Sequence, residues 1–219
     1  MIIAIDGPAG TGKTTVAKKL ASLISFKYFD TGLMYRALTF AALQKNVNCD
    51  SNDLVLQLLD ANLIEFRTEN NEVKIFFGND DITDKLTSKE VTGLVSKISA
   101  YEDVRQHMVL QQRHIAKDDN FITVGRDIGT VVFPDAKLKI FLTASPEVRA
   151  ERRYNEIIEK KLTTTIPTKE EILNDITRRD FLDSSRTSSP LKPAKDAIII
   201  DTSHLSIDQV VEKILKLVP

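Results

Sequence analysis

The chain alternates short apolar runs with amphipathic stretches. Five of the apolar runs have the length and composition of buried strands in a parallel sheet. They occupy residues 1–5, 26–29, 121–124, 138–142 and 197–200. Between them, apolar residues return every three or four positions, which predicts helices over residues 13–25 and 33–44. Strands that alternate with helices predict an α/β fold in which helices cover both faces of a parallel sheet.

Several of the predicted helices carry start signals. Capping boxes begin at Thr87, Thr168 and Ser206, each followed three residues later by Glu or Gln. Ser145 precedes Pro146, which is the order of a capping residue and a proline at the first helical position. We therefore expect a helix to start at each of these four places.

One stretch has the period of two that is typical of strands. In residues 62–83, apolar and polar side chains alternate on either side of the turn sequence Glu-Asn-Asn-Glu. An antiparallel hairpin does not belong in a parallel core, so we expect a small inserted β-unit. Residues 163–165 and 184–195 are rich in turn-forming residues, which predicts mobile segments.

Composition and charge exclude several classes of protein. The 219 residues are 42% hydrophobic, and 30 Lys and Arg balance 31 Asp and Glu to a net charge of −1. This balance offers no whole-chain attraction to nucleic acid or to an anionic membrane. A single cysteine forms no internal disulfide or zinc cluster, and no apolar run has the ~20 residues that span a bilayer. We expect a cytoplasmic protein that binds neither nucleic acid nor membrane, and nothing demands more than a monomer.

A glycine-rich loop is the most specific motif in the chain. The pattern G-x-x-x-x-G-K-[ST] follows the first predicted strand and precedes the first predicted helix. Its glycines let backbone N–H groups turn inward, Lys13 supplies a charge for β- and γ-phosphates, and the Thr14 hydroxyl suits Mg²⁺. We predict a site for a nucleoside triphosphate with Mg²⁺, formed by Gly7, Pro8, Ala9, Gly10, Thr11, Gly12, Lys13, Thr14 and Thr15.

Arginines follow the predicted strand ends and line later segments. They are Arg36, Arg126, Arg149, Arg152, Arg153, Arg178, Arg179 and Arg186. Guanidinium groups bind phosphate oxygens in a bidentate manner, and ligands gather at the carboxyl ends of parallel strands. The chain has no His/Asp pair that suggests a general base. A phosphate acceptor explains this absence, because its second pKa of ~6 leaves an anionic oxygen at neutral pH. These residues favour a kinase that acts on a phosphate.

Three motifs, the first of which contains the glycine-rich loop, resemble those of the bacterial cytidylate (CMP) kinases, a family of P-loop nucleoside monophosphate kinases. They read IDGPAGTGK from Ile5, FDTGLMYR from Phe29 and GRDIGTVVFPDA from Gly125. The segment Arg-Asp-x-x-Asp-x-x-Arg from Arg179 also matches, and the resemblance runs from Ile3 to the C-terminus. It implies a P-loop NTPase three-layer fold with a small antiparallel β insertion and a helical lid. It also implies ATP-dependent phosphorylation of CMP and dCMP in pyrimidine metabolism.

The resemblance also implies regions and roles. The core would comprise residues 1–30, 118–145 and 195–219, with an acceptor-binding region at 31–117 and a lid at 146–190. Lys13, Arg126 and the lid residues Arg149, Arg152 and Arg153 would act in catalysis. The CMP site would comprise Thr31, Tyr35, Arg36, Ser96, Arg105, Arg126, Asp127, Arg179, Asp183 and Arg186. In that set, Ser96, Arg105 and Asp127 would read the cytosine.

One departure from the family pattern matters, and two alternatives stay open. Many members carry an acidic residue directly before Gly-Arg-Asp, where this chain has Val124. Orientation of the Mg²⁺ would then fall to Asp6, Asp127 or water alone. The first alternative is a P-loop kinase for UMP, AMP or a small-molecule alcohol. The second is a nucleotide-dependent switch or binding module, although the Asn-Lys-x-Asp motif of a guanine-specific switch is absent.

Overall fold

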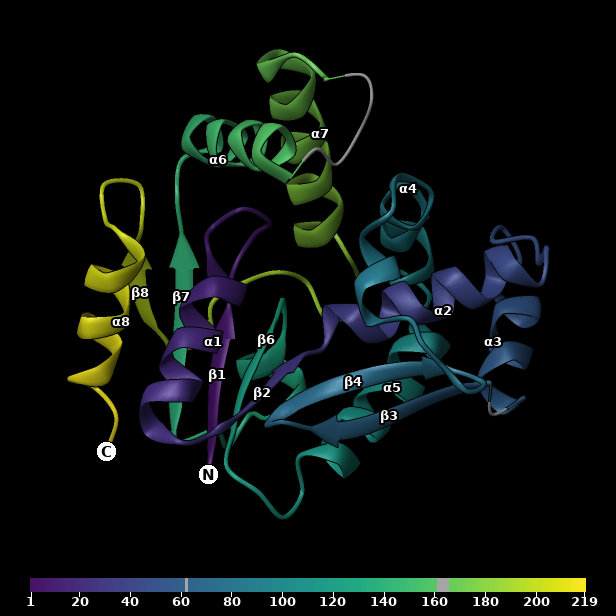
Figure 1. Ribbon diagram of the computed structural model, residues 1–219, viewed down its shortest axis with the longest axis horizontal. Helices are drawn as coiled ribbons and strands as arrows, with labels where there is room; N and C mark the ends of the chain where they lie inside the picture. The colour runs from purple at the N-terminus through teal and green to yellow at the C-terminus, as the bar shows by residue number, and fades with distance from the viewer. Residues whose placement is uncertain (62, 161–165) are drawn as a thin grey trace.

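The computed structural model describes residues 1–61, 63–160 and 166–219. Its strands are β1 (Ile2–Asp6), β2 (Lys27–Asp30), β3 (Ile64–Glu69), β4 (Glu72–Phe77), β5 (Asp80–Asp81), β6 (Phe121–Gly125), β7 (Leu138–Thr143) and β8 (Ile198–Asp201). In these residues they form one eight-stranded sheet in the order β3-β4-β2-β6-β1-β7-β8, and β5 pairs with β4 (Figure 1). The pairs β2–β6, β6–β1, β1–β7 and β7–β8 are all parallel, as predicted.

The position of each strand in the sheet decides how deeply it is buried. Ile3 and Ile5 on central β1 are 0% exposed, because helices cover both faces of the sheet there. On β8, in contrast, Ile198 and Ile199 are 40% and 60% exposed. The prediction that 197–200 is a buried strand was therefore wrong, because β8 is the last strand of the sheet and has a neighbour on one side only.

Helices cover both faces of the sheet, and further helices lie beyond the carboxyl ends of its central strands. They are α1 (Lys13–Ile24), α2 (Gly32–Gln44), α3 (Asn52–Asp60), α4 (Lys89–Ile98), α5 (Glu102–Ile115), α6 (Pro146–Lys160), α7 (Lys169–Ser184) and α8 (Ile207–Leu215), with a 3₁₀ turn η1 (Thr83–Thr87) and a π-helical turn η2 (Ile128–Val132). Apolar side chains of α1 and α8 pack on one face, and those of α2, α3 and α5 pack on the other. The predicted three-layer α/β fold is confirmed.

Three of the four predicted helix starts are confirmed. The Thr168 and Ser206 capping boxes are complete in both directions, and Val148 N donates to Ser145 Oγ at 3.3 Å. The predicted capping box at Thr87 is wrong by one residue. Thr87 ends η1, and Ser88 caps α4 by accepting a hydrogen bond from Val91 N at 3.3 Å.

The predicted hairpin is confirmed, but its relation to the sheet differs from the prediction. Asn70 and Asn71 have φ of 51° and 63°, the left-handed pair that a tight two-residue turn needs. Strand β4 also pairs in parallel with β2, through Tyr28 and Glu72. The hairpin thus extends one edge of the main sheet instead of forming a separate unit.

Helices α6 and α7 pack together beyond the carboxyl ends of the central strands (Figure 1). Their shared apolar contact is formed by Ala150, Ile157, Ile172 and Ile176. The predicted turn-rich residues 163–165 lie outside the described residues. After α7 the chain is irregular as far as β8, and Leu191 N donates to Asp183 O at 2.8 Å. In the ranges described above, no helix is both long and apolar enough to cross a membrane.

Candidate active site

The glycine-rich loop connects β1 to α1 and is shaped by close contacts. Gly7 has φ of 144°, and a Cβ there would lie 2.0 Å from Leu142 O on β7. Gly12 has φ of 88° directly before the first residue of α1. A Cβ on Gly10 would lie 3.1 Å from Arg149 Cβ, so α6 sits close over the loop. Glycine is therefore required by backbone conformation and by packing at this loop.

Lys13 is buried against its own loop. Its Nζ donates to Pro8 O at 2.5 Å and to Thr11 Oγ1 at 3.4 Å, and the residue is only 7% exposed. Burial, followed by the positive charge of Arg126, lowers the pKa of Lys13 well below its usual range. The positive charge of the ammonium group is poorly compensated here. Bound phosphates would therefore stabilise that charge and raise the pKa of Lys13 again.

Asp30 is the carboxylate beside the loop threonine. Thr14 Oγ1 donates to Asp30 Oδ2 at 3.3 Å, and Gly32 N donates to Asp30 Oδ1 at 3.0 Å. Sequence reasoning assigned Asp30 no role, although an acidic residue that closes a strand beside the loop was a usable signal. Among residues 1–61, 63–160 and 166–219, no group of three or more His, Cys, Asp and Glu side chains could hold a metal.

The two carboxylates named for Mg²⁺ from the sequence are engaged elsewhere. Asp6 accepts hydrogen bonds from Ile128 N and Gly129 N, both at 2.8 Å. Burial raises the pKa of Asp6 to about 6, although these two bonds work against the shift. Asp127 forms a buried ion pair with Arg105. Both carboxylates are therefore already bound to other groups of the protein, namely backbone N–H groups for Asp6 and a guanidinium group for Asp127.

An arginine cluster surrounds one buried carboxylate across the cleft. Arg126 Nε donates to Asp183 Oδ2 at 2.9 Å. Arg186 donates to Asp183 Oδ1 and, at 3.0 Å, to Ser99 Oγ. Arg179 Nε is buried and has no hydrogen-bond partner in the part of the chain that the structure describes. Burial, then the charges of Arg126 and Arg36, lower the pKa of Arg179 to about 10.

Arg36 belongs to the same electrostatic neighbourhood. It donates to Leu86 O and to Thr92 Oγ1, both at 3.0 Å, which fixes it against η1 and α4. Burial lowers the pKa of Arg36, and Arg126 and Arg153 contribute in the same direction. Several guanidinium groups thus share one region with too few carboxylates, which is an arrangement that attracts an anion.

Arg105 and Asp127 form an ion pair next to this arginine cluster. Their ion pair is almost fully buried, and Arg105 also donates to Ser99 O at 3.1 Å. The guanidinium carbon lies 5.3 Å from the centre of the Tyr35 ring, and burial raises the pKa of Tyr35 to about 12. Ser99 therefore contacts Arg105 and Arg186, and sequence reasoning missed it because a serine alone is no signal.

Two other predicted acceptor residues have defined places. Ser96 is half-buried on α4, and its carbonyl accepts a hydrogen bond from Ser99 Oγ at 3.2 Å. Thr31 is buried, and its Oγ1 donates to Val124 O at 3.0 Å. This bond fixes the start of α2 against the end of β6.

The three predicted lid arginines on α6 have different targets. Arg149 is 3% exposed, donates to Ala9 O at 3.2 Å and pairs with Asp180 at 2.6 Å. Arg152 donates to Thr202 O at 2.5 Å. Arg153 is partly exposed and pairs with Glu156 on its own helix. Only Arg149 contacts the glycine-rich loop directly.

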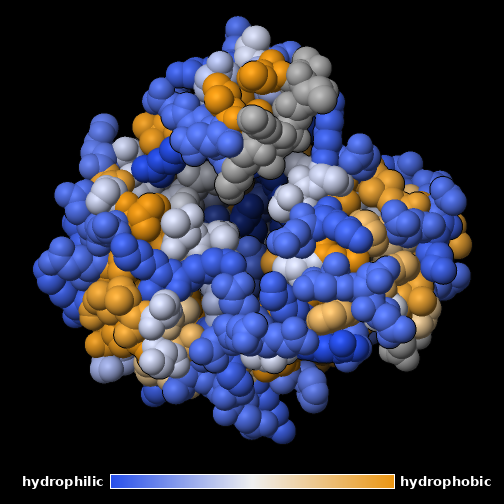
Figure 2. All heavy atoms as spheres, viewed as in Figure 1, coloured by the Kyte–Doolittle hydropathy of each residue, from blue (hydrophilic) through white to orange (hydrophobic). Residues whose placement is uncertain are grey.

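Thr202 links Arg152 to the loop. Its Oγ1 donates to Thr11 O at 3.2 Å while it accepts from Arg152 at 3.0 Å. It follows β8 in sequence, where no motif drew attention to it. In the view of Figure 2, the surface is hollowed near its middle, with hydrophilic residues in the depth of the hollow and residues of intermediate hydropathy at its rim. A glycine-rich loop at the end of β1 that faces an arginine cluster at the strand ends is the arrangement of a P-loop nucleotide-binding protein.

Comparison with known proteins gives the family. The model of the family described as cytidylate kinase matches residues 3–219. A cytidylate kinase of Halalkalibacterium halodurans is 47% identical over 98% of this chain and 96% of the relative. One of Protochlamydia amoebophila is 48% identical over 99% of this chain and 95% of the relative. The chain belongs to the cytidylate kinase family.

A solved structure supports the fold alone. It is that of an uncharacterized protein from Eubacterium ventriosum, with a TM-score of 0.51 and 16% identity. The match covers 99% of this chain and 97% of that protein. It agrees with the layered arrangement of helices around a mostly parallel sheet.

Proposed function

We propose that the chain transfers the γ-phosphoryl group of ATP to CMP, and also to dCMP. Membership of the cytidylate kinase family supports this reaction. One structural observation carries it: the glycine-rich loop faces a second cationic site, where the buried Nε atom of Arg179 lacks a partner among the described residues. A hydrolase or a switch has no need of a second phosphate site, whereas a nucleoside monophosphate kinase must align two phosphates.

The loop residues Gly7–Thr15 would bind the ATP phosphates through backbone N–H groups. Lys13 would leave Pro8 O and follow the phosphates, because its ammonium is poorly compensated without them. Arg149 lies over the loop and would neutralise charge that develops during transfer. Arg152 would act through Thr202 and the loop, and Arg153 would face the acceptor side.

The acceptor phosphate would bind to Arg36, Arg126 and Tyr35, while Arg179, Asp183 and Arg186 would face the ribose. No base is needed, because the phosphate oxygen is already anionic at neutral pH. The enzyme therefore needs alignment and charge neutralisation for in-line transfer.

Cytosine would be read by Ser96, Arg105 and Asp127, beside Thr31. Arg105 occupies one oxygen of Asp127, so the other can accept from the exocyclic amine of cytosine. Uracil would present a carbonyl there, acceptor to acceptor. A buried polar mismatch of this kind can discriminate by ~10⁴-fold.

Mg²⁺ would accompany ATP, and the residues present fit it. Thr14 offers a hydroxyl and Asp30 a carboxylate next to it, which are oxygen ligands of the kind that Mg²⁺ prefers. When bound, the ion would neutralise charge on the β- and γ-phosphates. Thr14 would supply an oxygen directly, and Asp30 would fix its surroundings.

We also propose how the chain divides and where it acts. Residues 1–30, 118–145 and 195–219 would be the core, 31–117 the acceptor-binding region and 146–190 a lid. Closure of the lid would exclude water and suppress hydrolysis of ATP. We also propose a monomeric cytoplasmic enzyme of pyrimidine metabolism. The balanced charge supports the expectation that it binds no nucleic acid and no membrane.

A coupled assay of ATP consumption across acceptors tests this function. We expect the highest kcat/KM with CMP, with dCMP also used, and slow hydrolysis in the absence of an acceptor. Faster turnover of UMP, AMP or a small-molecule alcohol would overturn the cytidylate assignment. Substantial hydrolysis without CMP phosphorylation would instead indicate a nucleotide-dependent switch.

A further inference from the structure

The carboxylate of Asp30 is held at both of its oxygens. Oδ1 accepts from Gly32 N at 3.0 Å, at the start of α2. Oδ2 accepts from Thr14 Oγ1 at 3.3 Å and from Tyr28 Oη at 3.2 Å. The loop threonine that suits Mg²⁺ therefore already meets a carboxylate of fixed orientation, and Tyr28 is one of the groups that fix it.

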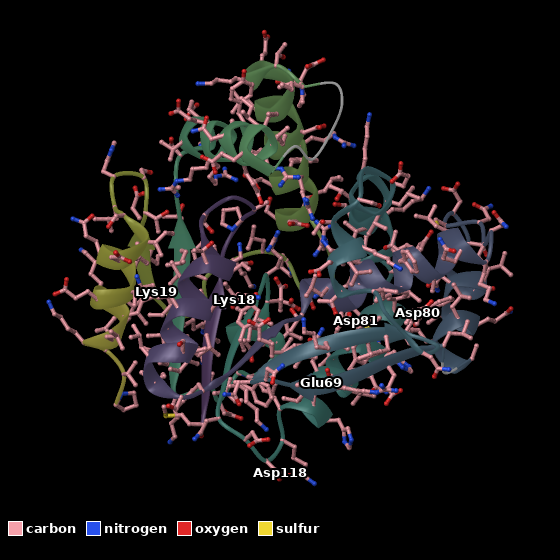
Figure 3. All side chains as sticks on the ribbon, viewed as in Figure 1. Lys18, Lys19, Glu69, Asp80, Asp81 and Asp118 are labelled. Atoms are coloured by element: carbon pink, nitrogen blue, oxygen red, sulfur yellow. The ribbon has the colours of Figure 1, made fainter. Side chains whose placement is uncertain are left out.

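Tyr28 is well placed to keep that role. It is 4% exposed and packs in the same apolar cluster as Val16 and Ala17 of α1. Lys18 Nζ lies 5.2 Å from the ring centre and forms an ion pair with Glu72 at 2.7 Å, which links the hairpin to the site. Figure 3 labels Lys18 on α1.

Strand β6, which pairs with β2, has no carboxylate opposite Asp30. Asp30 and Val124 are partners in the parallel pairing of β2 with β6, so their side chains point to the same face of the sheet. Val124 is 1% exposed and belongs to the cluster that contains Tyr28. Asp6 and Asp127 are bound to protein groups, as described above. Asp30 is thus the carboxylate that contacts Thr14.

We propose that Asp30, held by the Tyr28 hydroxyl, orients the Mg²⁺ that accompanies ATP in this chain. Asp30 does so in place of a carboxylate at position 124, and Tyr28 is a positioning residue. Groups that orient a metal's surroundings change its affinity by about 10-fold to 100-fold when they are removed. The proposal deepens the proposed function but rests only on its donor half, the binding of ATP with Mg²⁺.

Binding of a fluorescent ATP analogue, titrated with Mg²⁺ in the absence of any acceptor, tests the proposal. We expect Asp30→Asn to raise the Mg²⁺ concentration for half-maximal binding by about 10-fold or more. Tyr28→Phe removes one hydrogen bond of ~1 kcal/mol, so we expect about a 5-fold rise. Affinity for the analogue in EDTA should stay unchanged in both variants, since a merely structural role would weaken it as well.

Matched controls are Asp118→Asn, on an exposed loop labelled in Figure 3, and Tyr101→Phe, whose hydroxyl donates to Cys49 O at 2.9 Å. Both should keep the wild-type Mg²⁺ dependence. If Asp30→Asn also keeps it, the proposal is overturned, and if that variant does not fold, Tyr28→Phe decides in the same way. Failure of the wild type to phosphorylate CMP would refute the function but leave this result intact.

Discussion

Arg126 and Asp183 join two parts of the chain that lie far apart in sequence. Arg126 follows β6, Asp183 lies near the end of α7, and Nε to Oδ2 measures 2.9 Å. The same carboxylate accepts from Arg186 through its other oxygen. One acidic group thus balances part of an arginine cluster, and the remaining positive charge is what the proposed acceptor phosphate would neutralise.

Removing the carboxylate should destabilise the fold. In Asp183→Asn, Arg126 and Arg186 lose a charged partner that is only 4% exposed as a side chain. Breaking a buried pair in this way costs about 3 kcal/mol or more. We expect a clear drop in Tm by calorimetry, whereas the exposed control Asp118→Asn should unfold as the wild type does. An unchanged Tm in Asp183→Asn would contradict the interpretation of the pair.

The same pair predicts a pH dependence. Burial acts to raise the pKa of Asp183, but Arg126, Arg186 and Arg179 outweigh it and hold the pKa below its usual value. A lowered folded-state pKa contributes stability above the unfolded pKa of ~3.9, and this is lost as pH falls through the folded pKa. The difference in unfolding free energy between wild type and Asp183→Asn should be constant near neutral pH and shrink below about pH 4. Urea denaturation at several pH values measures it, and a difference that grows with acidity would exclude this cause.

Arg36→Ala should impair CMP use and spare ATP. Arg36 is fixed by Leu86 O and Thr92 Oγ1 on the acceptor side of the cleft. A bidentate contact of Arg36 with the CMP phosphate would comprise two charge-assisted hydrogen bonds, which contribute ~1.5–3 kcal/mol each. Their loss predicts a fall in kcat/KM for CMP of about 100-fold or more. ATP affinity should change little. Arg67→Ala, at a partly exposed residue of β3, serves as the control, and an unchanged kcat/KM in Arg36→Ala would refute the role.

Asp127→Asn should relax the choice of base. An amide at this position can donate to the uracil carbonyl, where the carboxylate can only accept. We expect the ratio of kcat/KM for CMP over UMP to fall by about 100-fold or more. Steady-state kinetics with both acceptors measures this ratio. Because Arg105 loses its buried partner, Tm is measured alongside, and a preserved ratio in folded protein would remove Asp127 from base recognition.

Arg149 and Arg152 should differ, although they lie one turn apart. Arg149 contacts Ala9 O in the loop, so Arg149→Ala should lower kcat by about 100-fold. Arg152 reaches the loop only through Thr202, so Arg152→Ala should lower kcat by less than about 10-fold. Single-turnover kinetics compares the two directly. Equal losses would mean that the helix moves so that both arginines face the phosphates.

The fold was largely predictable, and the departures have physical causes. Strand and helix periods, the glycine-rich loop and the Asn70-Asn71 turn are local properties, and the structure confirms them. Burial of β8 and the separateness of the hairpin were predicted wrongly, because both depend on which strand lies at which edge of the sheet. The Thr87 capping box failed because Ser88, one residue on, competed for the same helix start.

The sequence by itself determined the glycine-rich loop between the first strand and the first helix, the layered α/β fold and the arginines that follow the strand ends. Tertiary structure alone decided how those groups are partnered. It brings Arg126 to Asp183 and Arg105 to Asp127, and it places Asp30 and not Asp6 beside Thr14. The reason is that spacing along the chain reports only neighbours within one element. Which carboxylate meets which cation depends on strand order, register and the packing of α7 over the sheet.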